Sequence, residues 1–408
     1  MPYDVLIVGG GPSGSVAAAN LMGSGLRVCI VDRAHFPRLK PCGGGISCRA
    51  YKRFPYLEPV MRSVPTNYVH KLVFEAPCGE SVEFVSDEPL YAMIRRIEYD
   101  HALVEHCRRG GIEIREDVTV AKVEVLAEGV RLTSTAGEVF QAKLVIGADG
   151  VNSLVAVQSG LRGPWPHHKL AMDGTEESPQ TALPVAMDTM YVYYGRGGAN
   201  GYGYLFPKAT HVNFGIGYQL DYHRKTFTEK PFELHEEFLE QLKQRGVIQG
   251  ASQRENFHPW ILPVGGLMER LSTDRVLAVG DAAGFVNGFT AEGIYYAMVS
   301  GELAGKAALA ALRAGDVSAA SLRRYDRACE AELGYELRKS VELQERLLGD
   351  PRLIDNAVRL ARRSPAARRL LCEYGVGKLS YRQMKRRALL QALPAFLRYK
   401  AEKLWRRA

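Results

Sequence analysis

Three short glycine-bearing segments could bring backbone close to a phosphate-bearing ligand. They are Gly9-Gly10-Gly11-Pro12-Ser13-Gly14, Gly147-Ala148-Asp149-Gly150 and Gly280-Asp281-Ala282-Ala283-Gly284, and each follows an apolar run typical of a β-strand. Glycine allows tight turns and close backbone approach, and the N-terminus of a following helix offers free N–H groups to a pyrophosphate. Together the segments indicate that one dinucleotide, FAD, is held from three directions.

The first segment has the strongest sequence context. It lies between a β-like run at 5–8 and a helical pattern at 15–21, and a second β-like run at 27–31 ends at Asp32. Asp32 stands about 20 residues beyond the glycines, where the acid that binds a ribose is expected. The sequence therefore predicts a nucleotide site that includes Gly9, Gly11, Pro12, Ser13, Gly14, Asp32 and Arg33.

The other two segments supply further candidate contacts. Asp281 ends a strand and precedes small residues, so its carboxylate can accept hydrogen bonds from ribityl hydroxyls while Gly280 permits close approach. Asp149 and Gly150 are expected to serve the same nucleotide. No covalent-attachment motif accompanies these segments, so FAD is predicted to bind tightly and noncovalently.

The composition indicates a globular protein without a membrane span. The 408 residues suggest two or three structural modules, and 46% hydrophobic residues are ample for burial. The chain begins with no signal-peptide pattern, and no stretch approaches the roughly 20 apolar residues of a membrane span. Seven scattered cysteines without CxxC spacing fit reduced thiols and indicate no metal site. We therefore expect a cytoplasmic protein, neither secreted nor transmembrane.

The net charge of +8 is concentrated at the C-terminus. Residues 381–408 carry nine Lys and Arg against Glu402 alone, together with leucines, Phe396 and Trp405. A basic amphipathic segment suits an anionic membrane surface, so peripheral contact with the cytoplasmic membrane face is one expectation. The alternative is a C-terminal helix that packs on the body. Nucleic acid is not expected as a partner, because no recognition fold accompanies the charge.

The order of the patterns indicates an α/β fold with a divided FAD-binding domain. A Rossmann-type FAD-binding domain is expected to carry an inserted antiparallel-sheet substrate domain and a helical C-terminal region. A helix is expected from Arg95 to Arg109, and residues 165–265 have the pattern of antiparallel strands. The FAD-binding domain is assigned residues 1–70, 96–160 and 266–320, the substrate domain 71–95 and 161–265, and the helical region with its basic tail 321–408.

A wider set of motifs is more specific than the nucleotide-binding segments alone. In chain order they are Lys40-Pro41-Cys42-Gly43-Gly44-Gly45, Arg96-Ile97-Glu98-Tyr99-Asp100, the Asp149-Gly150 segment, Tyr202-Gly203-Tyr204-Leu205-Phe206-Pro207 and the Gly280-Asp281 segment. With these motifs the chain resembles the geranylgeranyl reductase family, within the p-hydroxybenzoate hydroxylase-like group of flavoproteins, over about residues 3–345. The resemblance implies reduction of isolated carbon–carbon double bonds in a prenyl chain attached to a diphosphate, a pigment, a lipid or a quinone.

The resemblance also implies roles for individual residues. Arg96 matches the family arginine that contacts the flavin or its pyrophosphate, although an ion pair with Glu98 or Asp100 would also explain it. The YxWxFP signature of the family lines the substrate cavity beside the flavin. The other flavin contacts that the resemblance implies are Cys42, Gly43, Gly44, Gly293 and Ile294.

The chain departs from the family pattern in two places. Tyr204 stands where the family usually has tryptophan, with Ala199 in place of an upstream proline. Residues 288–293 replace a more usual pattern with proline and a further glycine, at the turn that normally brings a helix N-terminus to the isoalloxazine. The first departure bears on the shape of the substrate channel, and the second on the flavin contacts.

Reduction of an isolated alkene needs a proton as well as a hydride. Reduced flavin can donate the hydride, but the alkene accepts it only as protonation of the less substituted carbon builds positive charge at the other carbon. Cys42 and Tyr202 are candidates for the donor arrangement, which could include an ordered water, and Tyr204 is expected to shape the pocket and stabilise positive charge. The alternatives are a buried structural cysteine and ordinary sheet aromatics.

The electron donor and two rival functions stay open. No second complete GxGxxG module appears, so either NADPH docks transiently or a ferredoxin-like protein supplies electrons. An FAD-dependent monooxygenase of an aromatic or lipid substrate would use the same nucleotide segments, although the Cys42 loop and the Tyr202 strand argue against it. A flavin halogenase is less favoured still, because its WxWxIP signature is absent. The third reading is a noncatalytic flavoprotein that carries prenyl lipids.

Deletion of residues 381–408 separates the two interpretations of the tail. If the tail binds membrane, the deletion should weaken association with anionic vesicles while flavin binding stays intact, because each cation near such a surface contributes on the order of 1 kcal/mol. If it is a packed helix, the deletion should lower thermal stability and FAD retention. Vesicle cosedimentation at low and high salt, with a melting curve, measures both; unchanged vesicle binding rules out the membrane role.

Overall fold

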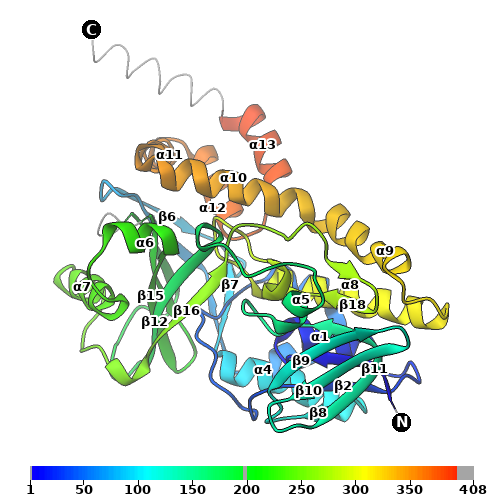
Figure 1. Cartoon of the computed structure of the whole chain (residues 1–408). Helices are drawn as coiled ribbons and strands as arrows, with labels where there is room; N and C mark the ends of the chain where they lie inside the picture. Colours follow the sequence, from blue (N-terminus) through cyan, green and yellow to red (C-terminus); the bar gives the residue numbers. More distant parts are fainter. Residues whose placement is uncertain (1, 196–199, 393–408) are drawn as a thin grey trace.

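The computed structural model describes residues 2–195 and 200–392 of the chain (Figure 1). Its first sheet has a parallel core in the order β18, β11, β1, β2 and β8. These strands are β1 (Tyr3–Val8), β2 (Val28–Val31), β8 (Glu113–Arg115), β11 (Val139–Gly147) and β18 (Val276–Ala278). Continuous apolar runs of this kind are typical of parallel strands covered on both faces. The predicted Rossmann-type α/β fold is confirmed.

Helix α1 follows β1 and packs directly against the longer helix α8. Helices α1 (Pro12–Ala19), α4 (Arg96–Arg109) and α8 (Ile294–Arg313) belong to this unit, and α1 contacts both of the others. The approach is close because α8 carries glycine there: a Cβ on Gly301 would lie 2.2 Å from the backbone oxygen of Ser13. The start of α1 is thereby fixed against α8.

Antiparallel strands are added to this sheet at β11 and at β18. Strands β9 (Val120–Leu126) and β10 (Gly129–Ser134) form a hairpin on β11, and β17 (Ser272–Thr273) pairs with β18. The short helix α5 (Leu154–Gln158) packs on β9. A separate three-stranded sheet contains β3 (Gly45–Ser47), β4 (Thr66–Val69) and β7 (Tyr91–Ile94), with α2 (Arg49–Arg53), η1 (Pro55–Leu57) and α3 (Glu58–Arg62) between β3 and β4.

A seven-stranded sheet lies beside the parallel sheet (Figure 1). Its order is β16, β12, β15, β14, β13, β5 and β6, and every neighbouring pair is antiparallel except β13 and β5. The strands are β5 (Lys71–Glu75), β6 (Ser81–Val85), β12 (Leu170–Pro179), β13 (Thr189–Tyr194), β14 (Gly201–Pro207), β15 (His211–Gln219) and β16 (Phe257–Pro263). Sequence-distant strands 71–85 therefore complete the sheet formed by 170–263.

Two helices interrupt the region in which only strands were expected. They are α6 (Leu220–Thr226) and α7 (Pro231–Gln244), and two single turns, η2 (His167–Lys169) and η4 (Arg254–Asn256), accompany them. The reason is helical spacing in α7, where Leu234, Phe238 and Leu242 are all buried. Proline at its first position and Glu233 in its first turn are typical of a helix start.

The C-terminal region is helical as expected, and it lies across the same side of both sheets (Figure 1). It contains α9 (Ala319–Cys329), η6 (Glu330–Gly334), α10 (Tyr335–Gly349), α11 (Pro351–Arg363), α12 (Pro365–Gly375), α13 (Tyr381–Arg387) and η7 (Ala388–Ala392). Leu343 and Leu347 of α10 pack in one apolar cluster with Phe74 and Met190 of the seven-stranded sheet. Among the described residues, no helix combines the length and the apolar character that crossing a bilayer requires.

The first turn of the predicted tail packs on the body. The backbone N–H of Tyr381 donates to Glu336 Oε2 at 2.6 Å, and its ring contacts Tyr335 and Tyr374. Deletion from residue 381 therefore removes packed residues as well as charge, so both readouts of that experiment are needed. Ala199 and residues 393–408 of the tail lie outside the described residues.

Candidate functional site

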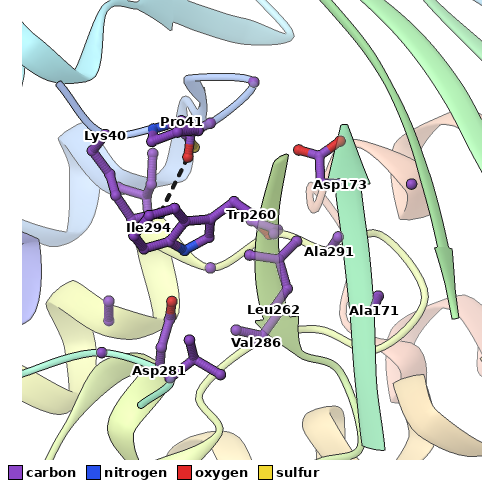
Figure 2. A pocket seen from close by; sticks show the side chains of 18 of the residues that line it. Lys40, Pro41, Ala171, Asp173, Trp260, Leu262, Asp281, Val286, Ala291 and Ile294 are labelled. Carbon is purple, nitrogen blue, oxygen red and sulfur yellow. Dashed lines mark hydrogen bonds between the residues drawn. The ribbon is translucent and has the colours of Figure 1, made fainter. Parts of the chain in front are cut away.

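One cavity of about 550 Å³ lies where the two large sheets and the C-terminal helices meet. Its wall includes residues from all three glycine segments, from the Cys42 loop, from the seven-stranded sheet and from α10. Figure 2 shows part of this wall, with Asp281 on one side and Asp173 across the cavity from it. Most of the predicted site residues thus share one cavity, although they come from distant parts of the chain.

Backbone contacts at the first segment need glycine. Gly9 has φ of +106°, and a Cβ there would lie 2.3 Å from the backbone oxygen of Ala148. A Cβ on Gly14 would lie 1.9 Å from the Gly9 oxygen. Gly14 therefore does not line the cavity but lets α1 start tight against β1. The predicted residues of this segment that do line it are Gly9, Gly11, Pro12 and Ser13.

Asp32 fixes the backbone around that segment. Its Oδ2 accepts the Gly10 N–H at 2.7 Å, and its Oδ1 accepts the Ala34 N–H at 2.9 Å. Asp32 and Arg33 both line the cavity. Because both carboxylate oxygens bind backbone N–H groups, the carboxylate is held at the end of β2 facing the nucleotide segment.

The Asp149 carboxylate points to a helix rather than to open cavity. It accepts from Ser153 Oγ at 2.5 Å and from the Val155 N–H at 3.1 Å, at the start of α5. Burial raises the pKa of Asp149, and these hydrogen bonds oppose that shift. Asp149 and Gly150, which has φ of +79°, still line the cavity. This segment therefore meets the cavity beside the start of α5.

The third segment brings η5 (Gly280–Ala283) and the start of α8 to the same wall. Gly280 has φ of +56°, and a Cβ there would lie 2.7 Å from Ser13 Oγ, so this glycine joins the first and third segments without lining the cavity. Asp281, Gly293 and Ile294 line it. The N-terminus of α8 has no side-chain cap, and neither has that of α1.

Arg96 lines the cavity and also forms an ion pair. Its Nε and Nη2 each donate to Asp100 at 2.7 Å, so Asp100 rather than Glu98 is its ion-pair partner. Arg38 also pairs with Asp100, at 3.1 Å. Arg96 is buried and lines the cavity, and the shared carboxylate holds two guanidinium groups beside it.

The Cys42 loop lies against strand β14. Gly44 has φ of +71°, and a Cβ there would lie 2.1 Å from the Ile94 oxygen. A Cβ on Gly43 would lie 2.9 Å from the Phe206 ring. Both contacts require glycine, and they place Cys42, Gly43 and Gly44 in the same wall as Tyr202 and Tyr204.

Sequence reasoning missed Lys208, which holds the same loop. Its side chain is fully buried, and its Nζ donates to the Cys42 oxygen at 3.4 Å and forms an ion pair with Glu177. Glu177 also accepts from Arg95 Nε at 2.8 Å. A single lysine after Pro207 gives no sequence signal for this role, because its partners Glu177 and Cys42 lie 31 and 166 residues away in the chain.

The two predicted tyrosines have different partners. The Tyr202 hydroxyl donates to the Thr290 oxygen at 2.7 Å, which joins β14 to the turn before α8. The Tyr204 hydroxyl lies 3.0 Å from Asp173 Oδ2 and 3.0 Å from Thr175 Oγ1. Asp173, which the sequence did not single out, is buried, and burial raises its pKa to about 6.

The residues present fit FAD. Glycine cradles that a Cβ would fill bring backbone to the cavity, and two helices start at its wall without side-chain caps. Unsatisfied N–H groups at helix N-termini favour anions such as a pyrophosphate. Lys40 adds a cation, with its Nζ 4.2 Å from the centre of the Trp260 ring (Figure 2).

Comparison with known proteins agrees with this fit. Residues 2–333 match the family described as FAD binding domain. The chain is 30% identical over 361 residues to digeranylgeranylglycerophospholipid reductase 1 of Methanothermobacter thermautotrophicus, over 85% of this chain and 86% of that protein. It is 31% identical over 338 residues to geranylgeranyl diphosphate reductase of Rhodobacter capsulatus, over 79% of each.

The fold is also found in a solved structure. A geranylgeranyl bacteriochlorophyll reductase-like protein from Thermoplasma acidophilum superposes with a TM-score of 0.80 at 19% identity, over 98% of this chain and 99% of that one. At this identity the comparison shows the shared fold alone.

Asp32→Ala is expected to raise the Kd for FAD at least about tenfold. The change leaves two backbone N–H groups without acceptors and frees the first nucleotide segment, and each unsatisfied group costs about 1–3 kcal/mol. Quenching of flavin fluorescence on binding measures the Kd. Asp350→Ala is the matched control, because Asp350 also accepts a backbone N–H, that of Arg352 at 3.2 Å, but outside the cavity wall. Equal affinity of both variants would contradict the assignment of Asp32.

Proposed function

The chain belongs to the geranylgeranyl reductase family of FAD-dependent oxidoreductases, and on this premise we propose that it saturates carbon–carbon double bonds of a geranylgeranyl-type prenyl chain. The observation that carries the proposal is the shared cavity, in which the nucleotide segments, Cys42 and an apolar aromatic wall meet. The substrate class extends to prenyl chains attached to a lipid, a quinone, a diphosphate or a pigment.

The apolar part of the cavity suits a prenyl chain. Its wall includes Phe74 and Met190 from the seven-stranded sheet, Phe289 from the turn before α8 and Leu348 from α10. The Tyr194 ring stacks on Phe289 with ring centres 5.5 Å apart. Apolar surface of this kind binds isoprene units by burial and keeps water from the reacting carbons.

FAD would be bound by the residues that the sequence singled out. We assign the nucleotide to Gly9, Gly11, Pro12, Ser13, Asp32 and Arg33, with Gly14 and Gly280 holding the backbone that shapes the site, and the flavin side to Cys42, Gly43, Gly44, Arg96, Asp149, Gly150, Asp281, Gly293 and Ile294. Bound and reduced, FAD supplies hydride. We propose tight noncovalent binding, with reduction by NADPH or by a ferredoxin-like protein.

We propose that side chains of the protein deliver the proton that the reaction needs. We assign Cys42 and Tyr202 to the arrangement that delivers a proton to the alkene, and Tyr204 to the wall that positions the chain and stabilises positive charge through its ring face. Lys208 supports this arrangement because its Nζ donates a hydrogen bond to the Cys42 carbonyl oxygen. The Tyr202 bond to Thr290 fixes the wall relative to the turn before α8.

Peripheral membrane contact is a further part of the proposal. Residues 351–392 contain eleven Lys and Arg against two Asp and Glu, so the described C-terminal helices are basic even without the residues that follow. Leu389 and Leu390 are 59% and 70% exposed beside these charges. A basic surface with exposed leucines suits anionic lipid, from which long prenyl chains would reach the cavity.

Anaerobic mixing of the photoreduced protein with prenyl substrates tests the function. A reductase should reoxidise its flavin while product mass rises by two hydrogens for each bond reduced. A monooxygenase of an aromatic or lipid substrate would need oxygen, and a noncatalytic lipid carrier would give neither change. Flavin that stays reduced with every prenyl substrate would contradict the proposal.

Cys42→Ala is expected to retain FAD and to lose alkene reduction by about a hundredfold or more, the usual effect of removing a group from proton delivery. Cys42→Ser should be partly active if hydrogen bonding, rather than thiol acidity, is what matters. Cys48→Ala is the control, because Cys48 lies a few residues away and outside the cavity wall. Full turnover by Cys42→Ala, measured as product formed per flavin, would remove Cys42 from the reaction.

A further inference from the structure

Tyr202 and Tyr204 at the proposed reaction site are weak acids, so a stronger acid is needed to supply their protons. The Tyr202 hydroxyl already donates to the Thr290 oxygen, and burial raises the pKa of both Tyr202 and Tyr204. A general acid works best when its pKa lies near the working pH. A neutral phenol with a raised pKa can pass a proton on only if another group replaces that proton at once.

Asp173 is the carboxyl group that reaches this position. It lies in the cavity wall on β12 (Figure 2), and its side chain is largely withdrawn from water. Its Oδ2 lies 3.0 Å from the Tyr204 hydroxyl, whereas its buried Oδ1 has no hydrogen-bond partner among the described residues. No ion pair among the described residues involves Asp173. A buried carboxylate without these partners is costly, so burial shifts Asp173 toward the neutral acid.

The contact between Tyr204 and Asp173 crosses a whole strand. Tyr204 lies on β14 and Asp173 on β12, with β15 between them. The β15 residue paired with Tyr204 is Gly215, and a Cβ there would lie 2.7 Å from Tyr204 Oη. The missing side chain at Gly215 is therefore what lets the phenol lie over β15 and reach β12.

The available hydrogens also fit a protonated Asp173. The Tyr204 hydroxyl lies 3.0 Å from both Asp173 Oδ2 and Thr175 Oγ1, and the Thr175 hydroxyl donates to Asn213 Oδ1 at 2.9 Å. A phenol has one hydrogen to donate. When Tyr204 donates to Thr175, a neutral Asp173 can donate to the Tyr204 oxygen, and all three short contacts are then hydrogen bonds.

We propose that Asp173, acting through the Tyr204 hydroxyl, is the acid that supplies the proton to the alkene carbon. The inference rests on the proposed alkene reduction, and it moves the final proton transfer to Tyr204 while Cys42 and Tyr202 stay beside the reacting carbons. In this step the Tyr204 hydroxyl turns from Thr175 to the alkene. As the new C–H bond forms, the Tyr204 O–H bond breaks and the Asp173 proton moves to the Tyr204 oxygen, so Tyr204 ends neutral and Asp173 ends as a carboxylate. The second hydrogen and both electrons arrive as hydride from reduced FAD. Water then returns a proton to Asp173.

The charged and titratable groups around Asp173 set the direction of its pH dependence. Burial raises the pKa of Asp173 to about 6, against the hydrogen bond from Tyr204 and the charge of Lys40. Burial also lowers the pKa of Lys40 itself, to about 8. Tyr202 and Tyr204 on β14 and Tyr218 on β15 are the other titratable neighbours, and β16 places Trp260 opposite Asp173. Because the acid form is active, proton delivery should slow as pH rises through the pKa of Asp173.

The test compares wild-type protein with Asp173→Asn and Tyr204→Phe in anaerobic single turnovers with a prenyl substrate. Asp173→Asn keeps the shape and can still hydrogen-bond Tyr204, but it holds no acidic proton. We expect it to reoxidise flavin about 10²-fold or more slowly, with the pH dependence of the wild-type step lost. The FAD Kd should not change. Infrared titration of the oxidised protein should show a carboxylic acid band that disappears with a midpoint near pH 6 and is absent from Asp173→Asn.

Each other outcome contradicts the inference in a distinguishable way. Wild-type rate and pH profile in Asp173→Asn would show that the proton comes from elsewhere, and a slower step with the wild-type pH profile would leave Asp173 a purely structural role. The infrared titration needs only wild-type protein, so absence of a titrating carboxyl between pH 5 and 8 would overturn the proposal even if the variant failed to fold. Failure of wild-type protein to reduce any prenyl alkene would instead reject the proposed function.

Discussion

The site depends on backbone segments that approach one another more closely than any side chain would allow. At the carboxyl end of the parallel strands, Gly9 meets Ala148, Gly14 meets Gly9 and Gly280 meets Ser13, in each case at distances that a Cβ would block. These contacts bring the three nucleotide segments together. Because the ends of parallel strands share one edge of the sheet, the segments need only short turns to meet. The two uncapped helix starts follow from the same turns.

Strand β14 connects this nucleotide end to the rest of the cavity. On one side, Phe206 packs on Gly43 of the Cys42 loop; on the other, Tyr202 binds the turn before α8. Between them Tyr204 reaches Asp173 over Gly215. A prenyl chain in this cavity would therefore lie against β14, which Phe206 fixes to the Cys42 loop and Tyr202 fixes to the turn before α8. This arrangement places the buried carboxyl group of Asp173 in an apolar lining, as the proposed protonation of an isolated alkene would require.

The features that could be predicted from the sequence are those with a local sequence pattern. The glycine segments, Asp32 and the apolar runs carry their signal within about 30 residues, and the same holds for the α4 helix. The Asp173 contact could not be predicted, because it depends on the register of three strands and on the empty space at Gly215. Lys208 was missed for the same reason, since Glu177 and Cys42 meet it only in the folded sheet. The helical spacing in α7 was present in the sequence, but the surrounding tyrosine and glycine runs favoured strands throughout 165–265. The partner of Arg96 became clear only when Asp100 was placed beside both Arg96 and Arg38.

The central claim is that a single cavity holds FAD and the prenyl double bond between the Cys42 loop and β14. A crystal structure of the FAD-loaded protein with a prenyl analogue that cannot be reduced tests it most directly. The account predicts the flavin ring beside Cys42, Gly293 and Ile294, and the bond that replaces the alkene about 3–3.5 Å from the hydride-donating atom, on the side of Tyr204 and Asp173. An analogue bound outside this cavity, or on the side of the flavin away from Tyr204, would contradict it.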